Sequence, residues 1–387
     1  VVGVLVGLRF KLRASIQKSG RRIRRISTDR MIHTVRALFD TLLLALPVPL
    51  VFAFLAWAIA NQAWAGAWIR GLGSWFGWSS FTLMWIFSLC ELARPGGVGQ
   101  EHFGWEEDSS GVLRRSLRVI TLVYLPFLLI AGLSVHDSNP SYFDSAGRLG
   151  FIAAQLVLAV AFWKLFHPNS GVFSKLIREQ PDRLLAKGRY LWLALPAGVP
   201  VVLAVMAGMG YNLTAIILSE VFHSCLRWVA VAVVAYGLLL RWFTIKGRRL
   251  ALQERLAARE AHRAEQEVED AGHGEQVVVS EEELAEMDLE AVATQTRRLL
   301  RSLVGIGALV AMVYSASAML PLEKVSEVGA GGGFTWLGVL RAILIGAVGL
   351  TVVRNLPGLL DLAGMRESGV APGIRYAVAT LCQYAVG

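Results

Sequence analysis

Three ionisable side chains within one long apolar stretch could do chemistry. Glu220, His223 and Arg227 follow one another at spacings of three and four residues, so a helix places them on one face. Ionisable groups inside a membrane span are costly and are therefore candidates for function, such as a proton or ion relay. An intrahelical ion pair at the outer interface is the alternative, because the 29 residues of 214–242 make about 43 Å of helix against a core of about 30 Å.

The other ionisable residues and the cysteines do not form a pattern typical of an enzyme. Arg341 lies deep in the apolar stretch 335–353, where we expect its guanidinium to be paired or to reach toward the interface. The sequence contains no GxSxG, HExxH or Walker motif. Cys90, Cys225 and Cys382 lack the spacing of metal ligands and are predicted to be packing residues. We therefore expect no catalytic residues, no cofactor and no metal site.

A second set of candidates is basic. The pairs Arg21-Arg22 and Arg24-Arg25 lie in the segment 9–37, directly after an apolar run. Such a segment is expected to contact anionic lipid headgroups, or else it serves only to orient the chain. The net charge of +9 would suggest nucleic-acid binding in a soluble protein. Here the basic clusters flank apolar spans, as in oriented membrane proteins, and we expect no nucleic-acid partner.

The elements that must position these residues are apolar helices. Of the 387 residues, 55% are hydrophobic and only 17% are charged, which lies outside the range of soluble proteins. Eight stretches are long enough to cross a bilayer, namely 38–60, 72–92, 119–135, 148–166, 191–210, 214–242, 302–320 and 335–353. Two shorter runs, 1–8 and 374–387, adjoin the chain ends, and we expect the natural protein to continue on both sides. The sequence thus predicts an all-α polytopic membrane protein with about ten transmembrane helices arranged as hairpins.

Prolines interrupt several of these predicted spans. Pro47 and Pro49 lie in 38–60, Pro126 lies in 119–135, and Pro196 and Pro200 lie in 191–210. Proline would break a helix in water, but neighbouring helices in a membrane bundle satisfy the freed carbonyl groups. We therefore expect kinks at these positions.

The charges of the connecting segments predict the orientation. Alternate segments hold 31 of the 38 Lys and Arg residues, whereas the segments between them hold only three. The basic segments are 9–37, 93–118, 167–190, 243–301 and 354–375. By the positive-inside rule we expect them on the cytoplasmic side.

The segment 243–301 is predicted to form a charged cytoplasmic helical hairpin. Residues 244–270 are rich in Ala, Glu, Arg and Leu and favour a helix. Ser280 and Glu283 form a capping box that starts a second helix. This hairpin either is simply solvated or docks against another cytoplasmic domain.

The last connecting segment carries the most distinctive sequence motif of the chain. It reads Arg354-Asn355-Leu356-Pro357-Gly358-Leu359-Leu360, followed by Gly373-Ile374-Arg375-Tyr376-Ala377. Pro357-Gly358 turns the chain, and Arg354 and Arg375 flank a short apolar segment where they can hold phosphate headgroups. These residues resemble the segment before the pore helix in the large, MscK-type branch of the MscS-like mechanosensitive channels. The runs 248–253 and 289–301 also resemble that family's charged loop.

This resemblance implies a subunit of a tension-gated channel that gives osmotic protection in a bacterial inner membrane. It implies a homo-oligomer of seven subunits, with ions and small solutes passing through a pore outside this chain. Membrane lipids are the other expected partners. The regions would be a truncated first span (1–8), a basic segment (9–37), a lipid-facing paddle (38–242), the charged hairpin (243–301) and the last spans (302–387). A secondary transporter and a non-conducting scaffold or sensor remain as alternatives.

Overall fold

The computed structural model describes residues 2–23, 30–62, 66–135, 140–179, 184–269, 300–318 and 346. Its regular elements within these ranges are all helices. The chain divides into two compact units, Val1–His223 and Ser224–Gly387. The predicted all-α class is therefore confirmed for the described residues.

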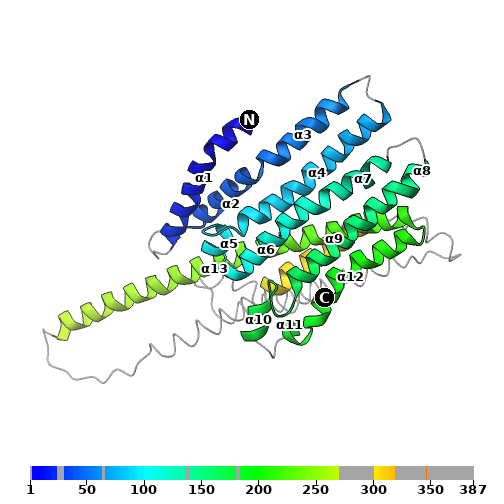
Figure 1. The fold of residues 1–387 in the computed structure, drawn as a ribbon. Coiled ribbons are helices and arrows are strands. Elements are labelled where there is room, and N and C mark those ends of the chain that lie inside the picture. Colours follow the sequence, from blue (N-terminus) through cyan, green and yellow to red (C-terminus); the bar gives the residue numbers. More distant parts are fainter. Residues whose placement is uncertain are drawn as a thin grey trace. The chain divides into compact units, whose positions relative to one another are not determined.

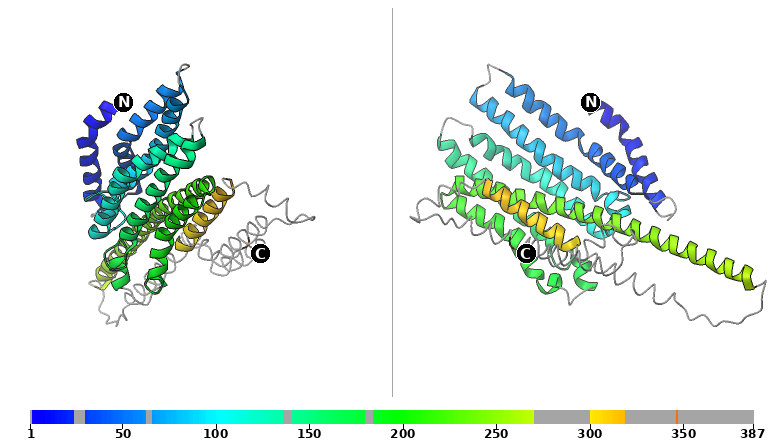
Figure 2. Two further views of the ribbon diagram at one scale, coloured as in Figure 1. Left: turned by 45° about the vertical axis from the view of Figure 1, so that its right-hand side comes forward. Right: turned by 180° about the vertical axis from the view of Figure 1, so that it is seen from behind.

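The first unit is a bundle of long helices joined by short ones (Figure 1). Neighbouring pairs along the bundle are α1 with α2, α3 with α4, α7 with α9 and α9 with α12, and the two further views agree (Figure 2). The elements are α1 (Val2–Ile23), α2 (Met31–Ala45), α3 (Pro47–Ala60), α4 (Ala67–Leu92), α5 (Val98–Glu101), α6 (Glu107–Val119), the π-helix η2 (Ile120–Tyr124), α7 (Leu125–Val135), α8 (Pro140–Tyr142), the π-helix η3 (Phe143–Gly147), α9 (Arg148–Phe166), α10 (Ser174–Glu179), α11 (Leu184–Lys187), α12 (Arg189–Gly208) and the beginning of α13 (Asn212–Glu269).

Five helices in the described part of the chain are long and apolar enough to cross a membrane, and six if α2 and α3 form one bent span. The five are Glu107–Ser134, Phe143–Phe166, Arg189–Gly208, Asn212–Lys246 and Leu300–Ala318. Helix α4 covers the predicted span 72–92 but is not among them. The predicted spans 335–353, except for residue 346, and 374–387 lie outside the described residues. The count of about ten spans is therefore not confirmed.

The prolines act in three different ways. Pro47 begins α3, and the axes of α2 and α3 differ by 52° at this break. Pro126 is the second residue of α7, which begins where the π-helical turn η2 ends, so the irregular turn lies just before the residue that lacks a backbone N–H donor. Helix α12 runs through Pro196 and Pro200 as one element. The break predicted near Pro47 is thus present as a bend between two helices.

Contacts at the two ends of the first unit follow the predicted alternation of the connecting segments. At the basic end, Lys175 Nζ lies 2.5 Å from Glu106 Oε1, and Ser109 Oγ donates to the Val172 carbonyl oxygen at 2.9 Å. These contacts join the segments 93–118 and 167–190. At the opposite end, the rings of Trp68 and Tyr142 lie 5.2 Å apart, and Asn212 Nδ2 donates to the Phe143 carbonyl oxygen at 3.4 Å. Consecutive connecting segments therefore lie at opposite ends of the first unit, as an arrangement of helical hairpins requires.

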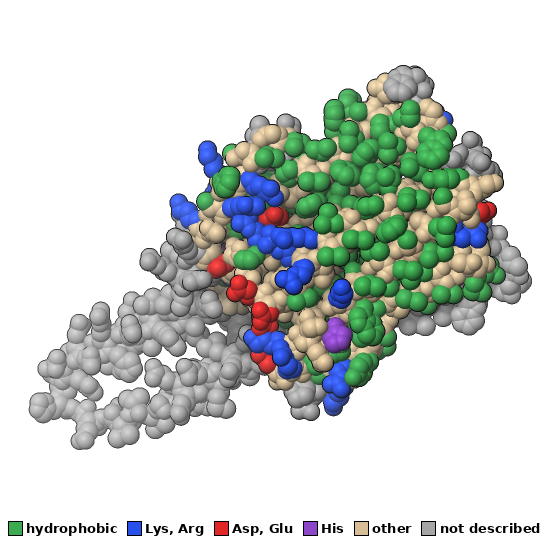
Figure 3. Space-filling view, viewed as in Figure 1, with side chains coloured by type: hydrophobic (Ala, Val, Ile, Leu, Met, Phe, Trp, Pro, Cys, Tyr) green, Lys and Arg blue, Asp and Glu red, His purple; other side chains and the backbone are tan. Residues whose placement is uncertain are grey.

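Large apolar side chains are exposed along the helices between these ends. Phe54 is 61% exposed, Trp57 63% and Leu122 75%. Figure 3 shows apolar side chains over most of one face, with the charged ones gathered at its margins. A soluble protein rarely exposes so large an apolar area, so this surface fits contact with lipid chains.

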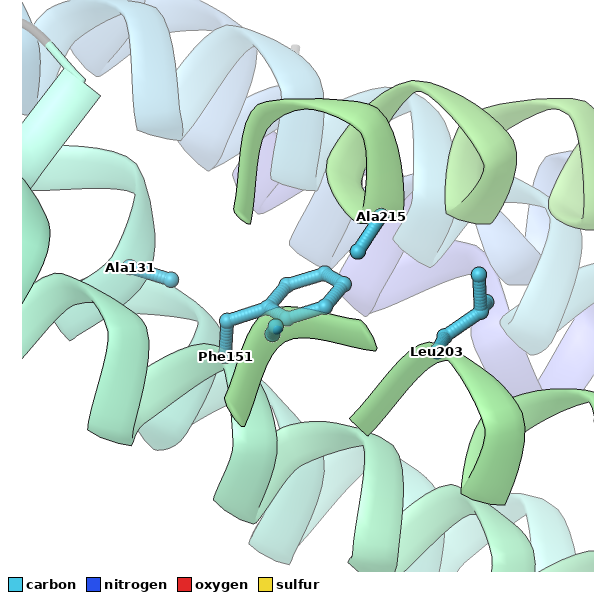
Figure 4. Packing of buried hydrophobic residues seen from close by; sticks show 5 residues of the cluster. Ala131, Phe151, Leu203 and Ala215 are labelled. Atoms are coloured by element: carbon cyan, nitrogen blue, oxygen red, sulfur yellow. The ribbon is translucent and has the colours of Figure 1, made fainter. Parts of the chain in front are cut away.

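The interior of the first unit is packed by small residues around one aromatic ring. Phe151 of α9 is 3% exposed and lies among Ala131 of α7, Leu203 of α12 and Ala215 of α13 (Figure 4). Alanine side chains let the helix backbones approach, as is usual where helices pack inside a bilayer. This cluster joins α7, α9, α12 and α13 at one level of the bundle.

In the second unit, α13 continues and a further helix runs over Leu300–Ala318. Trp228 Nε1 donates to Ser315 Oγ at 2.7 Å, which joins the two helices. Helix α13 has 58 residues, about 87 Å at 1.5 Å per residue, and includes the helix predicted for 244–270 up to Glu269. The capping box at Ser280 and Glu283 lies outside the described residues.

Candidate functional site

The structure places a network of polar side chains inside the apolar first unit. Four helical elements contribute, and each residue lies within a stretch predicted to span the membrane. The network consists of Trp78 of α4, Tyr124 of η2, Gln155 of α9, and Ser219, Glu220 and His223 of α13. Three of its members, Tyr124, Gln155 and Ser219, are buried.

Ser219, Glu220 and His223 lie within little more than one turn of α13, and the adjacent residues Ser219 and Glu220 face different neighbours. Glu220 Oε2 accepts a hydrogen bond from Trp78 Nε1 at 3.2 Å. Ser219 Oγ accepts one from Gln155 Nε2 at 2.9 Å. The single helix α13 is thereby joined through polar contacts to α4 on one side and to α9 on the other.

The contacts of His223 indicate how its imidazole is protonated. Nδ1 lies 2.7 Å from the carbonyl oxygen of Ser219, which can only accept, so Nδ1 carries a proton. In the neutral ring Nε2 is then an acceptor, and the Tyr124 hydroxyl at 3.1 Å donates to it. Each side chain thus fixes the orientation of the next, from η2 to the backbone of α13.

Tyr124, which contacts His223, is the last residue of the π-helical turn η2. A π-helix carries more residues per turn than an α-helix and therefore rotates the side chains that follow it. Here the π-turn ends at Tyr124, two residues before Pro126. The proline that the sequence marks as a kink thus lies beside the side chain that closes the network.

This arrangement is suited to coupling helices to one another. The described residues contain no group of three or more His, Cys, Asp or Glu side chains that could hold a metal ion. A hydrogen bond between helices inside a bilayer contributes about 0.6 kcal/mol on average and up to about 1.7 kcal/mol. Several such bonds on one helix make its position sensitive to the positions of its neighbours.

Glu220 and His223, which the sequence singles out, belong to this network. Arg227 lies four residues beyond His223 on α13, in the second unit. The structure supplies partners on other helices, which the predicted intrahelical pair did not include. The ion pair with Arg227 and the proton relay both stay predictions.

The other predicted site residues lie at or beyond the limits of the described structure. Arg21 and Arg22 are in α1, and the basic segment is helical up to Ile23. Outside the described residues lie Arg24, Arg25, Arg341, Arg354, Asn355, Leu356, Pro357, Gly358, Arg375 and Tyr376. Their roles remain predictions.

Sequence reasoning missed Trp78, Tyr124, Gln155 and Ser219. Gln155 could have been found, because it is the one amide side chain in the apolar stretch 148–166 and a buried amide requires a partner. Trp78 and Tyr124 could not, since amphipathic aromatic residues are frequent in membrane spans and carry no signal of their own.

Prediction for the network: replacing Tyr124 with phenylalanine keeps the ring and removes only the hydroxyl donor. We expect this change to lower the free energy of unfolding by about 0.6 kcal/mol, and by no more than about 1.7 kcal/mol. Thermal unfolding of the detergent-purified chain measures the effect. Tyr190→Phe is the matched control, because Tyr190 is 65% exposed and should change little. Equal shifts in the two variants would mean that the Tyr124–His223 hydrogen bond does not stabilise the bundle.

Comparison with known proteins finds one family over most of the chain. Residues 1–322 match the family described as mechanosensitive ion channel inner membrane domain 1. The miniconductance mechanosensitive channel MscM of Escherichia coli is 29% identical over 403 residues, which cover 99% of this chain and 36% of that protein. The mechanosensitive channel MscK of Escherichia coli is 23% identical, over 97% of this chain and 33% of that protein.

An uncharacterized MscS family protein of Haemophilus influenzae is 26% identical, over 99% of this chain and 35% of that protein. The chain therefore spans about a third of the length of each of these curated relatives. The family suggested by the residues at 354–376 is thus matched over a region, 1–322, that does not include them.

Proposed function

Since the chain belongs to the family of mechanosensitive ion channel inner membrane domains, we propose that it is the tension-sensing membrane region of a channel subunit. The observation that carries this proposal is the helical bundle of the first unit, with its exposed large apolar side chains, within the segment that the family covers. Its helices present large apolar side chains outward and polar hydrogen bonds inward. Such a bundle can take up a force from the bilayer and pass it along α13.

The proposed mechanism depends on a difference in membrane area between two states. Tension shifts an equilibrium only if the open and closed states interact with the bilayer differently. Changing the open fraction from 1% to 99% requires about 5.5 kcal/mol of such difference. We propose that the region 38–242 is a lipid-facing paddle that collects this energy, with the bend between α2 and α3 and the π-turn before Pro126 as points where it deforms.

The complete topology that we propose has about ten spans, with the basic segments 9–37 and 243–301 on the cytoplasmic side of a bacterial inner membrane. In it 1–8 ends a first span, 243–301 forms a charged helical hairpin, and 302–387 leads toward a pore helix beyond this chain. The side-chain contacts that join alternate connecting segments at each end of the first unit support this arrangement. The function would be ion transport and osmotic protection rather than catalysis, without a cofactor.

The proposed partners are membrane lipids and identical subunits, seven by resemblance. Ions and small solutes would pass through a pore formed outside this chain. Arg21, Arg22, Arg24 and Arg25 are proposed to contact anionic lipids.

Recording from liposome patches that contain the full-length protein tests the function. Suction raised stepwise should evoke unitary currents, and a protein ending at Gly387 should give none. A folded, reconstituted full-length protein that stays silent up to patch rupture would contradict the channel and favour a transporter or a scaffold.

Prediction for the last connecting segment: in the full-length protein, Pro357→Ala or Arg354→Gln should shift the tension threshold and leave the unitary conductance unchanged. The reason is that a turn and a headgroup contact before the pore helix affect the closed–open equilibrium but not the pore lining. Pressure-ramp recordings measure both quantities in one patch. A changed conductance at an unchanged threshold would assign these residues to the pore instead.

A further inference from the structure

Arginines from three parts of the first unit gather around one buried carboxylate at its basic end. We call this group the arginine cluster. It consists of Arg9 and Arg13 of α1, Arg94 in the turn after α4, and Arg114 and Arg118 of α6, around Glu91 at the end of α4. None of these six residues takes part in the polar network described above. The cluster brings together segments that are more than a hundred residues apart in the sequence.

The carboxylate compensates only part of this positive charge. Arg9 Nη2 lies 3.7 Å from Glu91 Oε1, and Arg94 Nη1 lies 3.5 Å from Glu91 Oε2. Both separations are longer than the 2.7–2.9 Å of a strong charge-assisted hydrogen bond. Each guanidinium group has five N–H donors, so one carboxylate cannot satisfy the two groups that approach it most closely.

Arg13 gives an independent observation, a buried donor atom in the arginine cluster. Its Nε atom is buried and has no hydrogen-bond partner among the described residues. Burial lowers the pKa of the Arg13 guanidinium, and the nearby charges of Arg94 and Arg9 lower it further. A buried donor without a partner costs free energy, and an anion accepting from Arg13 would remove both the orphaned donor and the mutual repulsion.

The surface beside the arginine cluster is apolar. Phe10, next to Arg9, is 80% exposed, and Val119, next to Arg118, is 48% exposed. Figure 3 shows Lys and Arg side chains gathered where the apolar surface meets the α1, α5 and α6 end of the unit. A ligand there would meet positive charge at one end and an apolar surface at the other, which is the chemistry of a lipid.

We propose that the arginine cluster binds the phosphate group of an anionic membrane lipid, whose acyl chains lie on the apolar surface that begins at Phe10 and Val119. Arginine suits this role because its planar fork of donors matches phosphate oxygens. The site holds α1, α4 and α6 together through a shared ligand and so makes their packing depend on lipid composition. It rests on the proposed membrane location of the chain and not on the presence of a pore.

Native mass spectrometry of the detergent-purified chain tests the site directly. Phosphatidylglycerol is titrated against phosphatidylcholine, and inorganic phosphate is added in a separate arm. The test variant is Arg13→Gln with Arg114→Gln. The matched control is Arg115→Gln with Arg178→Gln, which removes the same charge from exposed positions outside the cluster.

The unchanged chain should retain phosphatidylglycerol in preference to phosphatidylcholine. The test variant should bind phosphatidylglycerol roughly thirtyfold more weakly, and the control should bind it nearly as well as the unchanged chain. If the test variant fails to fold, Arg118→Gln, at the exposed rim, should weaken binding by itself about fivefold.

Three outcomes would overturn the proposal. Equal losses in the test and control variants would indicate diffuse surface charge. No preference for phosphatidylglycerol in the unchanged chain would exclude the lipid. Binding of inorganic phosphate in place of the lipid would assign the cluster to a soluble phosphate. Because the assay needs no ion current, its failure leaves the proposed channel function untouched.

Discussion

Replacing Phe151 with alanine should lower the free energy of unfolding of the chain by roughly 3 kcal/mol, at the lower end of the range for such truncations in soluble cores. The ring is 3% exposed and lies among residues of α7, α12 and α13. Lipid chains cannot fill the space that it leaves, because helices close the site. The cost stays near the lower end of that range since inside a bilayer helix association depends on packing contacts and not on transfer from water.

Chemical or thermal unfolding in detergent measures this change, followed by the tryptophan fluorescence of the chain. Leu149→Ala is the matched control, because Leu149 precedes Phe151 by two residues on α9 but is 69% exposed. It should cost less than about 0.5 kcal/mol, as expected of a surface substitution. Equal losses in the two variants would show that the interior of this bundle is not packed as described.

Valine in place of Gly150 should be nearly as costly, with a loss of about 2–3 kcal/mol from overpacking. An added Cβ would lie 3.0 Å from the Ile130 Cβ and 3.1 Å from the backbone nitrogen of Ala131. The backbone of α7 cannot move aside as a flexible side chain would. Helices α7 and α9 must therefore separate, which also loosens the contacts of Phe151 one residue further along.

Gly198→Val is the control for the Gly150 substitution. Gly198 lies within α12, and an added Cβ there would meet no atom within 4 Å. Size-exclusion profiles after stepwise heating compare the two variants under one condition. A Gly150 variant as heat-resistant as the Gly198 variant would mean that α7 and α9 do not pack closely at this point.

The two substitutions also bear on gating. If α7, α9, α12 and α13 move as one body under tension, a loosened interface dissipates part of the force before it reaches the second unit. Variants at Phe151 and Gly150 in the full-length protein should then raise the tension threshold. The hydrogen bond between Tyr124 and His223 also joins two neighbouring helical segments, but its loss should lower the free energy of unfolding by less than either substitution.

Local composition was enough to predict the apolar helices of the described part of the chain, but not that α1 continues to Ile23 or that α6 forms in the segment 93–118. Runs such as 148–166 and 214–242 are helical because a backbone in hydrocarbon must satisfy its own hydrogen bonds. The alternation of basic and neutral connections required consecutive connections to lie at opposite ends, and the contacts of Lys175 and Trp68 agree. These properties can be read from the sequence without knowing which helices are neighbours.

Which polar groups meet depends instead on how the helices pack. Glu220 pairs with Trp78 across 142 residues, and His223 with Tyr124 across 99. The spacing on α13 places Glu220 and His223 on one face, but it carries no information on what that face contacts. Likewise, the sequence marks Arg9 and Arg114 only as basic residues. Helix α1 packs against α2, α3 and α5, and α6 packs against α4; this arrangement, which residue order does not reveal, brings both arginines near Glu91.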